Sequence, residues 1–490
     1  MKDFLKAHFV KLFLFLALAL LPAVGGARAA DTNSNSLVWH KAVNRVDADI
    51  HGEPLWPLLE DIAHQTDWHI FVEPGTARNA STKFQDLPQD DALRMLLGNL
   101  NFAFVPQTNG PDFLYVFTTR RENATRHVVV TNAAPRRVAN ELLVKLKPGA
   151  DIDALAKLLG AKITGRNDKL GLYRLLFENA TSTDAALASL KGNSDVAAVD
   201  YDNYLDPPPV ARPIASSSVP SGAGPISLTL NPPTSGDPCS PIVGMIDTGI
   251  QSQSLGNLNQ FILPAISVTG DAGSGASVQS IGSPVELFTP KQVAASGGAL
   301  LPTHGTSMAE TILRAVSQAS GGSSSVRILP VDVYGASETT TSWNVALGIQ
   351  AAVDNGATIL NLSLGGSSDS SVLDSVIQQA LASGVVIFAA AGNTPVNTPT
   401  YPAAIPGVND VTALSQPGQL ASYANFSPQV DLALPGASVV YIGSQAFIVQ
   451  GTSPATAYAT GIAAGTKSVN CSVWAQILRS MQAKFPVPQR

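Results

Sequence analysis

The residues best suited to chemistry lie in the second half of the chain, where one histidine and two serines stand in similar settings. His304 opens the stretch HGTSMAE, which also contains Ser307, and Ser453 lies in GTSPATA. A serine hydroxyl becomes a nucleophile when a neighbouring base takes its proton, and an acidic group must then orient that base and balance its charge. These residue types predict acyl-transfer chemistry and raise the question of which serine performs it.

The distribution of histidines limits the choice of base. The chain has seven histidines, and His304 is the only one that follows His127. If the C-terminal half of the chain uses a histidine base, that base is His304. His64 and His69 could suggest a metal site nearer the N-terminus, but no cluster of further ligands accompanies them, and an amphipathic helix followed by a strand explains both more simply.

Buried strands that alternate with helices must position these side chains. Continuous apolar segments such as PIVGMI, ATILNLSL and VVIFAAAG are typical of a parallel sheet that is covered by helices on both faces. Asp247 ends IVGMID, Ser363 ends ILNLS and Asn393 ends VVIFAAAGN. Because functional residues of open α/β sheets gather at the carboxyl ends of the strands, we expect these three side chains to lie close together.

Five motifs, IVGMIDTGI, HGTSMAE, NLSLGG, AAAGN and GTSPATA, follow one another in this order. Together they resemble the subtilisin family of serine peptidases, whose reactive residues come in the chain order Asp, His, Ser. The resemblance covers about residues 240 to 480. It implies an α/β, subtilisin-like fold with a parallel sheet flanked by helices, and two small α+β domains are expected before it.

The resemblance also implies a role for each residue of the site. Asp247 would orient His304, His304 would take the proton of Ser453, and Asn393 together with the Ser453 N–H would face the oxyanion. Ser307 lies one turn beyond His304 on the same expected helix, so we expect it to pack rather than react. The substrate strand and pocket wall would comprise Ser363, Leu364, Gly365, Gly366, Ala391 and Gly392, and this small, uncharged lining predicts a preference for apolar residues before the cut.

The sequence departs from the family pattern in two places. Pro454 follows the expected nucleophile where the family usually has methionine, but proline suits a first helical position and leaves the Ser453 N–H intact. The interval between Asp247 and His304 matches poorly and is rich in Gly, Ser and Gln. No dense carboxylate loop indicates a calcium site, so no cofactor is predicted, and a structural calcium ion cannot be read from the sequence.

Two smaller units are expected before the peptidase-like domain, which we place at residues 237–490. Residues 40–120 resemble the short N-terminal domain of secretins and TonB-dependent receptors, which docks onto other envelope proteins; a folded spacer is the alternative. Residues 138–205 follow the strand and helix order βαββαβ of a ferredoxin-like fold. Placed directly before a peptidase domain, this second unit resembles the inhibitory propeptide of the subtilisin family.

The propeptide resemblance implies a precursor that cuts itself. The tail of this unit, VDYDNYLDPPP, would lie in the active site, and cleavage is expected near Tyr204 to Asp206 or in the linker that follows. This linker, residues 206–236, is rich in Pro, Ser and Gly and is expected to be extended and exposed. The proline run at 207–209 would obstruct cleavage of some of these bonds.

The first 29 residues predict export. Three lysines precede an apolar run from Leu12 to Val24, and Ala27-Arg28-Ala29 follows, which is typical of a signal peptide cleaved after Ala29. A retained N-terminal anchor is the alternative. The expected location is secreted or periplasmic, and the secretin-like unit favours a Gram-negative bacterium.

The net charge argues against one class of function, and the cysteine content allows a disulfide. The net charge of −6 is not the profile of a nucleic-acid-binding protein. The chain has two cysteines, Cys239 and Cys471, which could form a disulfide in an oxidising compartment. Two buried thiols are the alternative.

Two alternative hypotheses about function fit part of the sequence. A catalytically inactive binding or scaffold protein of the cell envelope would keep the fold, but such proteins usually lose one of the four catalytic residue types, and all four are present. Asp247-Thr248-Gly249 also fits the aspartic-peptidase motif, but the chain has no second copy of it. We therefore expect a serine endopeptidase that acts on protein or peptide substrates, with its own propeptide as inhibitor.

Overall fold

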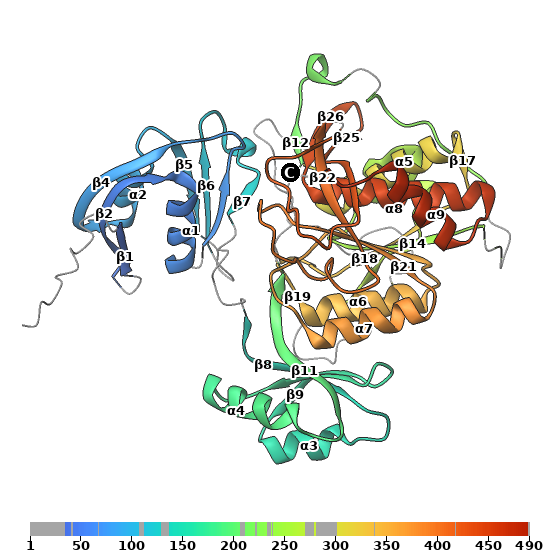
Figure 1. The fold of residues 1–490 in the computed structure, drawn as a ribbon, viewed down its shortest axis with the longest axis horizontal. Coiled ribbons are helices and arrows are strands. Elements are labelled where there is room, and N and C mark those ends of the chain that lie inside the picture. Colours follow the sequence, from blue (N-terminus) through green and yellow to red (C-terminus); the bar gives the residue numbers. More distant parts are fainter. Residues whose placement is uncertain are drawn as a thin grey trace, which may run out of the picture.

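In the computed structural model, the chain forms three folded units that follow one another along the sequence (Figure 1). The predicted signal peptide and residues 206–210 of the predicted linker lie outside the described residues. The structure describes residues 35–40, 43–66, 68–106, 112–128, 137–205, 211–220, 223–232, 237, 239–269, 279–280, 301–337, 339–416 and 418–488.

The N-terminal unit, residues 35–128, joins two helices and two sheets in one apolar core. Strand β4 was not predicted from the sequence, because its segment NASTKFQDLP is mostly polar and exposed. The helices are α1 (Leu55–Thr66) and α2 (Gln89–Leu97). One sheet has the order β1 (Ser36–His40), β2 (Arg45–Pro54), β4 (Asn79–Pro88), and the other has β5 (Asn101–Val105), β6 (Phe113–Phe117), β3 (His69–Val72), β7 (Arg126–Val128).

The ferredoxin-like unit, residues 137–205, has the predicted βαββαβ order. Its four long strands are antiparallel in the order β11-β8-β10-β9, and both helices contribute to its core. Helix α3 begins after Asp151, whose carboxylate accepts hydrogen bonds from the backbone N–H groups of Asp153 and Ala154. The elements are β8 (Arg137–Leu146), α3 (Ile152–Leu159), β9 (Lys162–Asn167), β10 (Leu172–Leu176), α4 (Ala180–Lys191) and β11 (Val196–Leu205).

The C-terminal unit, residues 211–488, is built around a mainly parallel sheet, as the sequence predicted. Short antiparallel strands, β16 (Gln279–Ser280) and β23 (Gln419–Leu420), lie at its edges. The parallel strands are β15 (Ile266–Ser267), β18 (Arg327–Asp332), β14 (Ile242–Asp247), β20 (Ile359–Leu362), β21 (Val386–Ala390), β22 (Asn409–Gln416) and β24 (Leu432–Pro435).

Helices cover both faces of this sheet and create two apolar cores. On one face, α6 (Ser342–Asp354) and α7 (Ser371–Ala382) pack on the strands. On the other face lie α5 (His304–Ser320) and α8 (Thr452–Asn470), with α9 (Trp474–Lys484) beside them. Among the described residues, none of the helices combines the length and the apolar character needed to span a membrane.

Part of the predicted linker is built into the C-terminal unit, which corrects the expectation that all of it is exposed. Strand β12 (Arg212–Pro213) pairs with β26 (Gln445–Gln450), which also pairs with β25 (Ala437–Ile442). Further on, β13 (Thr229–Leu230) runs parallel to β17 (Ser323–Ser324). This pairing buries small and apolar linker side chains, namely Ala211 and Leu228.

A disulfide joins Cys239 to Cys471. Cys239 lies just before β14, and Cys471 is the C-cap of α8. The bond therefore links the start of a central strand of the sheet to the C-terminal end of the long helix. The two residues are separated by 232 positions in the sequence, and the cross-link therefore spans nearly the whole C-terminal unit.

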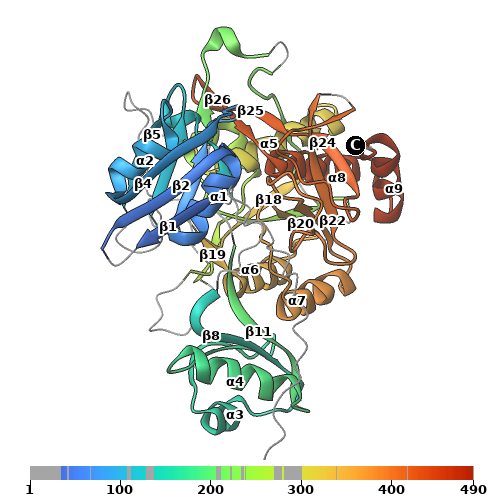
Figure 2. The ribbon, with the colours of Figure 1, turned by 60° about the vertical axis from the view of Figure 1, so that its left-hand side comes forward.

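The ferredoxin-like unit packs on α6 and α7 from outside the sheet, as Figures 1 and 2 both show. Two carboxylates of β11 meet the N-termini of these helices. Asp202 accepts a hydrogen bond from Trp343 N at 3.0 Å, and Asp200 accepts hydrogen bonds from the backbone N–H of Val372 and the hydroxyl of Ser371. Because helix N-termini carry unpaired N–H groups and partial positive charge, these contacts orient the unit on the sheet.

Candidate active site

Asp247 and His304 form a buried pair at the carboxyl edge of the sheet. Asp247 is the last residue of β14, and His304 is the first residue of α5. Nδ1 of His304 lies 2.8 Å from one carboxylate oxygen of Asp247 and 3.0 Å from the other. Both side chains are almost fully buried, so the contact holds the imidazole in one orientation in a medium where charge attraction is strong.

The loop after Asp247 fixes the start of α5. The N–H of Gly305 donates to the hydroxyl of Thr248 at 2.9 Å, and Thr303 caps the helix by accepting from Thr306 N. A Cβ at Gly305 would lie only 2.2 Å from the carbonyl oxygen of Thr248. Glycine is therefore required here, because any side chain would push the helix, and with it His304, away from Asp247.

Ser453 enters the site at the start of α8, directly after strand β26 and Gly451. Its hydroxyl donates to the carbonyl oxygen of Ser363 at 3.2 Å rather than to His304. Nε2 of His304 is buried and has no hydrogen-bond partner among the described residues. The structure thus brings the expected base and the expected carboxylate together, while the hydroxyl of Ser453 bonds elsewhere.

Asn393 follows β21 and has its side-chain amide fixed by the residue before Ser453. Its Oδ1 accepts a hydrogen bond from Thr452 N at 2.7 Å and lies 3.2 Å from the Thr452 hydroxyl. With the oxygen held in this way, the NH₂ of the amide is left to donate elsewhere. Thr452 was not predicted from the sequence as part of the site, although its place beside Ser453 is a signal that could have found it.

Ser307 belongs to the interior of α5. Its hydroxyl donates to the carbonyl of Thr303 at 3.1 Å, four residues back on the same helix, and the residue is completely buried. A serine that satisfies its own hydroxyl in this way is a packing residue.

The expected substrate edge, 363–366, is partly used inside the protein. Gly366 exchanges both backbone hydrogen bonds with Tyr401, at 2.9 and 2.8 Å. A Cβ at Gly365 would lie 2.9 Å from the methyl group of Thr400, so the space beside Gly365 is filled by the protein itself. At Gly366, by contrast, a Cβ would meet nothing nearer than the carbonyl oxygen of Tyr204 at 3.7 Å, so only Gly365 lacks room for a side chain beside it. Leu364, Ala391 and Gly392, the other expected wall residues, lie in the same region, and the N–H of Gly392 donates to the Thr452 hydroxyl.

A buried polar network that the sequence did not predict supports Ser363. The Asn361 amide donates to the Ser363 hydroxyl at 2.9 Å and accepts from the Thr460 hydroxyl at 3.0 Å. The Ser363 hydroxyl in turn donates to the carbonyl of Ser453 at 3.2 Å. Because buried hydrogen-bond networks rigidify their members, this one ties β20 to the start of α8.

Asp332 was also not anticipated. It ends β18 and is the register partner of Asp247 on the neighbouring strand. Burial raises the pKa of the Asp332 carboxyl and the nearby Asp247 raises it further, while backbone N–H groups of Tyr334 and Gly335 act in the opposite sense. The sheet thus places a second carboxyl beside the one that binds His304.

The end of the ferredoxin-like unit reaches this site. Tyr204 and Leu205, the last residues of β11, pair antiparallel with β19 (Thr340–Thr341). On the other side of the strand, a Cβ at Gly366 would lie 3.7 Å from the carbonyl oxygen of Tyr204. β11 therefore runs between β19 and the backbone at Gly366, in the way that an extended peptide adds a strand to a sheet edge.

Potential metal ligands come together at one place among the described residues, where Asp237 lies beside Cys239 and Cys471. The two sulfur atoms are joined in the disulfide, and a disulfide sulfur is not the thiolate that binds metals. This group of residues does not fit a metal site.

Comparison with known proteins agrees with the geometry. The model of the subtilase family matches residues 240–483, the segment that carries every residue of the site. This segment belongs to the subtilase family. The model of the fervidolysin N-terminal prodomain matches residues 123–201, which include most of the ferredoxin-like unit. Residues 123–201 thus resemble the prodomain of a subtilase, and residues 240–483 match the family itself.

Curated subtilase relatives match only part of the chain. A thermostable alkaline protease of Halalkalibacterium halodurans is 36% identical over 169 residues, which are 34% of this chain and 47% of that protein. Subtilisin Savinase of Lederbergia lenta is 34% identical over 178 residues, which are 36% of this chain and 66% of that protein. The chain thus spans about half to two thirds of the length of these relatives.

A solved structure with the same fold is that of fervidolysin from Fervidobacterium pennivorans, a keratinolytic enzyme related to subtilisin. It superposes with a TM-score of 0.50 at 17% sequence identity, over 70% of this chain and 57% of that one. At this level of sequence identity, the similarity supports the fold and nothing further.

Proposed function

We propose that this chain is a serine endopeptidase that hydrolyses peptide bonds with Ser453, His304, Asp247 and Asn393. The observation that carries the proposal is the buried bond between both carboxylate oxygens of Asp247 and Nδ1 of His304. A carboxylate on Nδ1 fixes the imidazole tautomer with a free lone pair on Nε2, which is the form that a general base requires.

The proton path follows from this geometry. With substrate present, the Ser453 hydroxyl turns from the carbonyl of Ser363 toward Nε2 of His304 and gives up its proton as Oγ attacks the peptide carbonyl. Asp247 stabilises the imidazolium that forms, and His304 then passes the proton to the leaving amine. Bonds between nucleophile and base are often not formed in substrate-free sites, so the present contact of Ser453 fits a resting state.

The negative charge on the attacked carbonyl oxygen needs donors. The NH₂ of Asn393 and the backbone N–H of Ser453 are the groups that we assign to it. Thr452 supports the assignment, because it engages Oδ1 of Asn393 and so directs the other half of the amide outward. Donors held in place before the reaction stabilise the transition state without further reorganisation.

The substrate chain would take the place of β11 beside β19 and Gly366. The expected lining, residues 363–366 with Ala391 and Gly392, is uncharged, which favours apolar side chains before the scissile bond. Proteins and peptides are therefore the proposed substrates. Cleavage of a peptide library only after arginine or lysine would contradict this preference.

We further propose that the ferredoxin-like unit is an inhibitory propeptide removed by self-cleavage. Tyr204 and Leu205 lie on one side of the site, at β19, while Arg212 lies on the other side, paired with β26. The bonds between Leu205 and Ala211 join these two sides, which shifts the expected cut to a point after Leu205. Three peptide bonds in this stretch have a residue other than proline on their C-terminal side, namely the bonds before Asp206, Val210 and Ala211.

The proposed setting is outside the cytoplasm. Residues 1–29 have the features of a signal peptide, and the disulfide suits an oxidising compartment. Secretion or a Gram-negative periplasm is the location that these features favour. Docking of the N-terminal unit to an envelope protein rests on its sequence resemblance alone.

The proposal is tested by following purified precursor on a gel over time, as wild type and as Ser453→Ala. The wild type should convert to a fragment that starts at residue 206, 210 or 211, as N-terminal sequencing would show. The Ser453→Ala variant should stay intact. A wild type that remains uncut, even after limited proteolysis of the ferredoxin-like unit, would contradict the proposal and favour an inactive scaffold.

A further inference from the structure

The outer face of the second sheet in the N-terminal unit is aromatic. Side chains of alternate residues on β3, β6 and β7 stack on one another there, with ring centroids 4.8 to 6.2 Å apart. The opposite face of the same sheet packs on the helices of the unit. The aromatic face therefore does not belong to the main core of its own unit. The stacked residues are His69, Phe71, Phe113, Tyr115 and His127.

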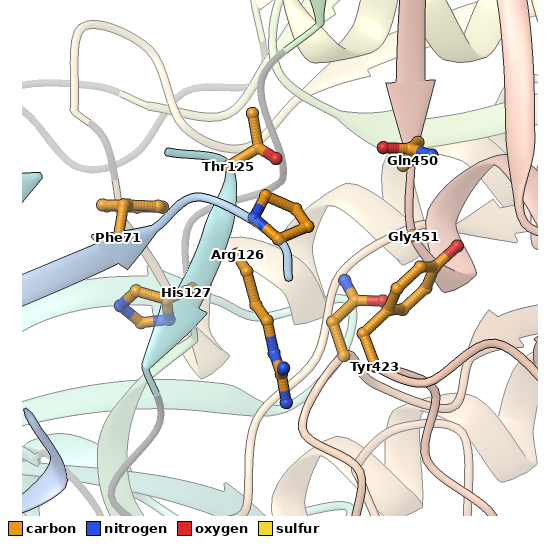
Figure 3. A pocket seen from close by; sticks show the side chains of 9 residues that line it. Phe71, Thr125, Arg126, His127, Tyr423, Gln450 and Gly451 are labelled. Atoms are coloured by element: carbon orange, nitrogen blue, oxygen red, sulfur yellow. The ribbon is translucent and has the colours of Figure 1, made fainter. Parts of the chain in front are cut away.

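Two residues of this face, Phe71 and His127, lie against the subtilase next to its active site. A pocket lies between the N-terminal unit and the subtilase. The N-terminal unit lines it with residues in and just after β3, Phe71 and Pro74, and with residues in and just before β7, Thr125, Arg126 and His127. From the subtilase it is lined by Asn393, Tyr423, Gln450 and Gly451. Figure 1 shows β7 at the side of the unit nearest the subtilase, and Figure 3 shows Arg126 between His127 and Tyr423.

Two of the subtilase residues that line the pocket lie in or beside the proposed catalytic site. Asn393 is the proposed oxyanion donor, and Gly451 lies two residues before Ser453. Gln450 ends β26, and its side chain accepts a hydrogen bond from Arg212 at 3.1 Å. The N-terminal unit therefore lies beside the proposed oxyanion site and not on a remote surface of the subtilase.

The path of the chain identifies which side of the site is covered. Leu205, before the proposed cut, lies at β19, where the acyl part of a substrate would bind. Arg212, after the proposed cut, lies on β26 and contacts Gln450, where the leaving part would bind. Because Gln450 and Gly451 line the pocket, the N-terminal unit covers the leaving-group side.

We propose that the N-terminal unit is a second inhibitory module, which closes the leaving-group side of the active site while the ferredoxin-like unit closes the acyl side. The inference rests on the proposed peptidase function. After self-cleavage, the two modules form one fragment, so each has to leave before a long substrate can bind. The partner of this face is then the subtilase of the same chain, in place of an envelope protein.

Arg126 gives the contact a chemical character. Its guanidinium lies 3.9 Å from the centre of the Trp56 ring, and its Nε is buried without a hydrogen-bond partner among the described residues. Stacking on Trp56 holds the side chain against its own unit while it faces Tyr423 across the pocket. Small changes at this point should therefore weaken the contact with the subtilase before they unfold the unit.

The test uses the full-length precursor with Thr125→Arg, which places a bulky charged side chain in the pocket without removing the contact of Arg126 with Trp56. The control is Thr82→Arg, the same substitution on β4, in the other sheet of the unit. Arg126→Ala serves as a second variant in case the first does not fold, which thermal unfolding would reveal. Each protein is followed by gel for self-cleavage and by hydrolysis of a quenched peptide that extends on both sides of its scissile bond.

If the inference holds, all four proteins cut themselves at similar rates, but Thr125→Arg and Arg126→Ala gain activity sooner after the cut. We expect the gain about tenfold faster for Thr125→Arg, equal to a loss of roughly 1.4 kcal/mol of binding. The Thr82→Arg control should match the wild type. Equal rates of gain in the pocket variants and the control would overturn the inference, whereas a wild type that never cuts itself would instead overturn the peptidase function.

Discussion

Asp247 holds the imidazole of His304 with both of its carboxylate oxygens, at 2.8 and 3.0 Å from Nδ1. The two residues are 57 positions apart in the sequence and come from the end of a strand and the start of a helix. Their contact leaves Nε2 as the one ring nitrogen that can take a proton. The assignment of general base chemistry to His304 depends on this pairing.

Replacing Asp247 with asparagine should nearly abolish activity while preserving the fold. The amide has a similar shape but can donate to Nδ1, which would favour the imidazole tautomer that carries its proton on Nε2. We expect kcat to fall by about 10⁴-fold. Peptide hydrolysis would be measured beside thermal unfolding of both proteins. Near-normal kcat in a folded Asp247→Asn variant would show that His304 does not act through this pair.

Asn393→Asp separates the two functions of the amide. The carboxylate keeps an oxygen for Thr452 but lacks the NH₂ that we assign to the oxyanion, and its charge opposes the negative charge that develops there. We expect kcat to fall by roughly 10²–10³-fold or more, with KM little changed. A variant that instead raises KM and keeps kcat would place Asn393 in substrate binding rather than in stabilisation of the transition state.

Asp202 should make release of the cut proregion depend on pH. Burial raises the pKa of the Asp202 carboxyl to about 7 in the assembled chain; nearby Glu141 adds to the rise, while Arg174 and the hydrogen bond from Trp343 N oppose it. A group with a raised pKa favours the assembled state at low pH, so association should be strongest below about pH 4 and should weaken as the pH rises to about 7.

The measurement is the rate at which activity develops after self-cleavage at a series of pH values, with every sample assayed at one common pH. Release by the wild type should speed up at least about tenfold between pH 5 and pH 7.5, the equivalent of one pKa unit. Asp202→Asn keeps an acceptor for Trp343 N but does not titrate, so its release should vary little. Faster release of the wild type at the lower pH would contradict the sign of this prediction.

The bond between Cys239 and Cys471 should stabilise the subtilase. It closes a loop of 232 residues, and cross-links over long loops restrict the unfolded chain most strongly. Changing both cysteines to serine should cost about 2–4 kcal/mol, and calorimetry should show a melting temperature lower by roughly 5–15 °C. Reductant should lower the melting temperature of the wild type similarly and leave the double variant unaffected. An unchanged melting temperature in the double variant would show that the bond adds nothing.

The sequence predicted most of the subtilase because its signals are local. Buried strands appear in the sequence as continuous apolar segments, and Asp247 ends one such strand while Asn393 follows another. The βαββαβ order of the ferredoxin-like unit could also be predicted, since the hydrophobic periodicity of each element is clear. Strand β4 was missed because a polar, exposed strand has no apolar alternation to mark it.

Contacts between distant segments could not be read from the sequence. The glycines at 365 and 366 suggested an open pocket, but Thr400 and the carbonyl of Tyr401 fill the space beside Gly365. Which residues lie opposite a glycine depends on tertiary packing. The position of the N-terminal unit over Asn393 was unpredictable for the same reason, because neither surface carries a motif that identifies its partner.

The most direct test of the account is covalent labelling of the self-processed protein with a fluorophosphonate, followed by mass spectrometry of the modified peptide. Wild type and Ser307→Ala should both carry the label on Ser453, and Ser453→Ala should carry none. Label on Ser307, or equal labelling of Ser453→Ala and wild type, would contradict the claim that Ser453 is the nucleophile of a subtilase peptidase.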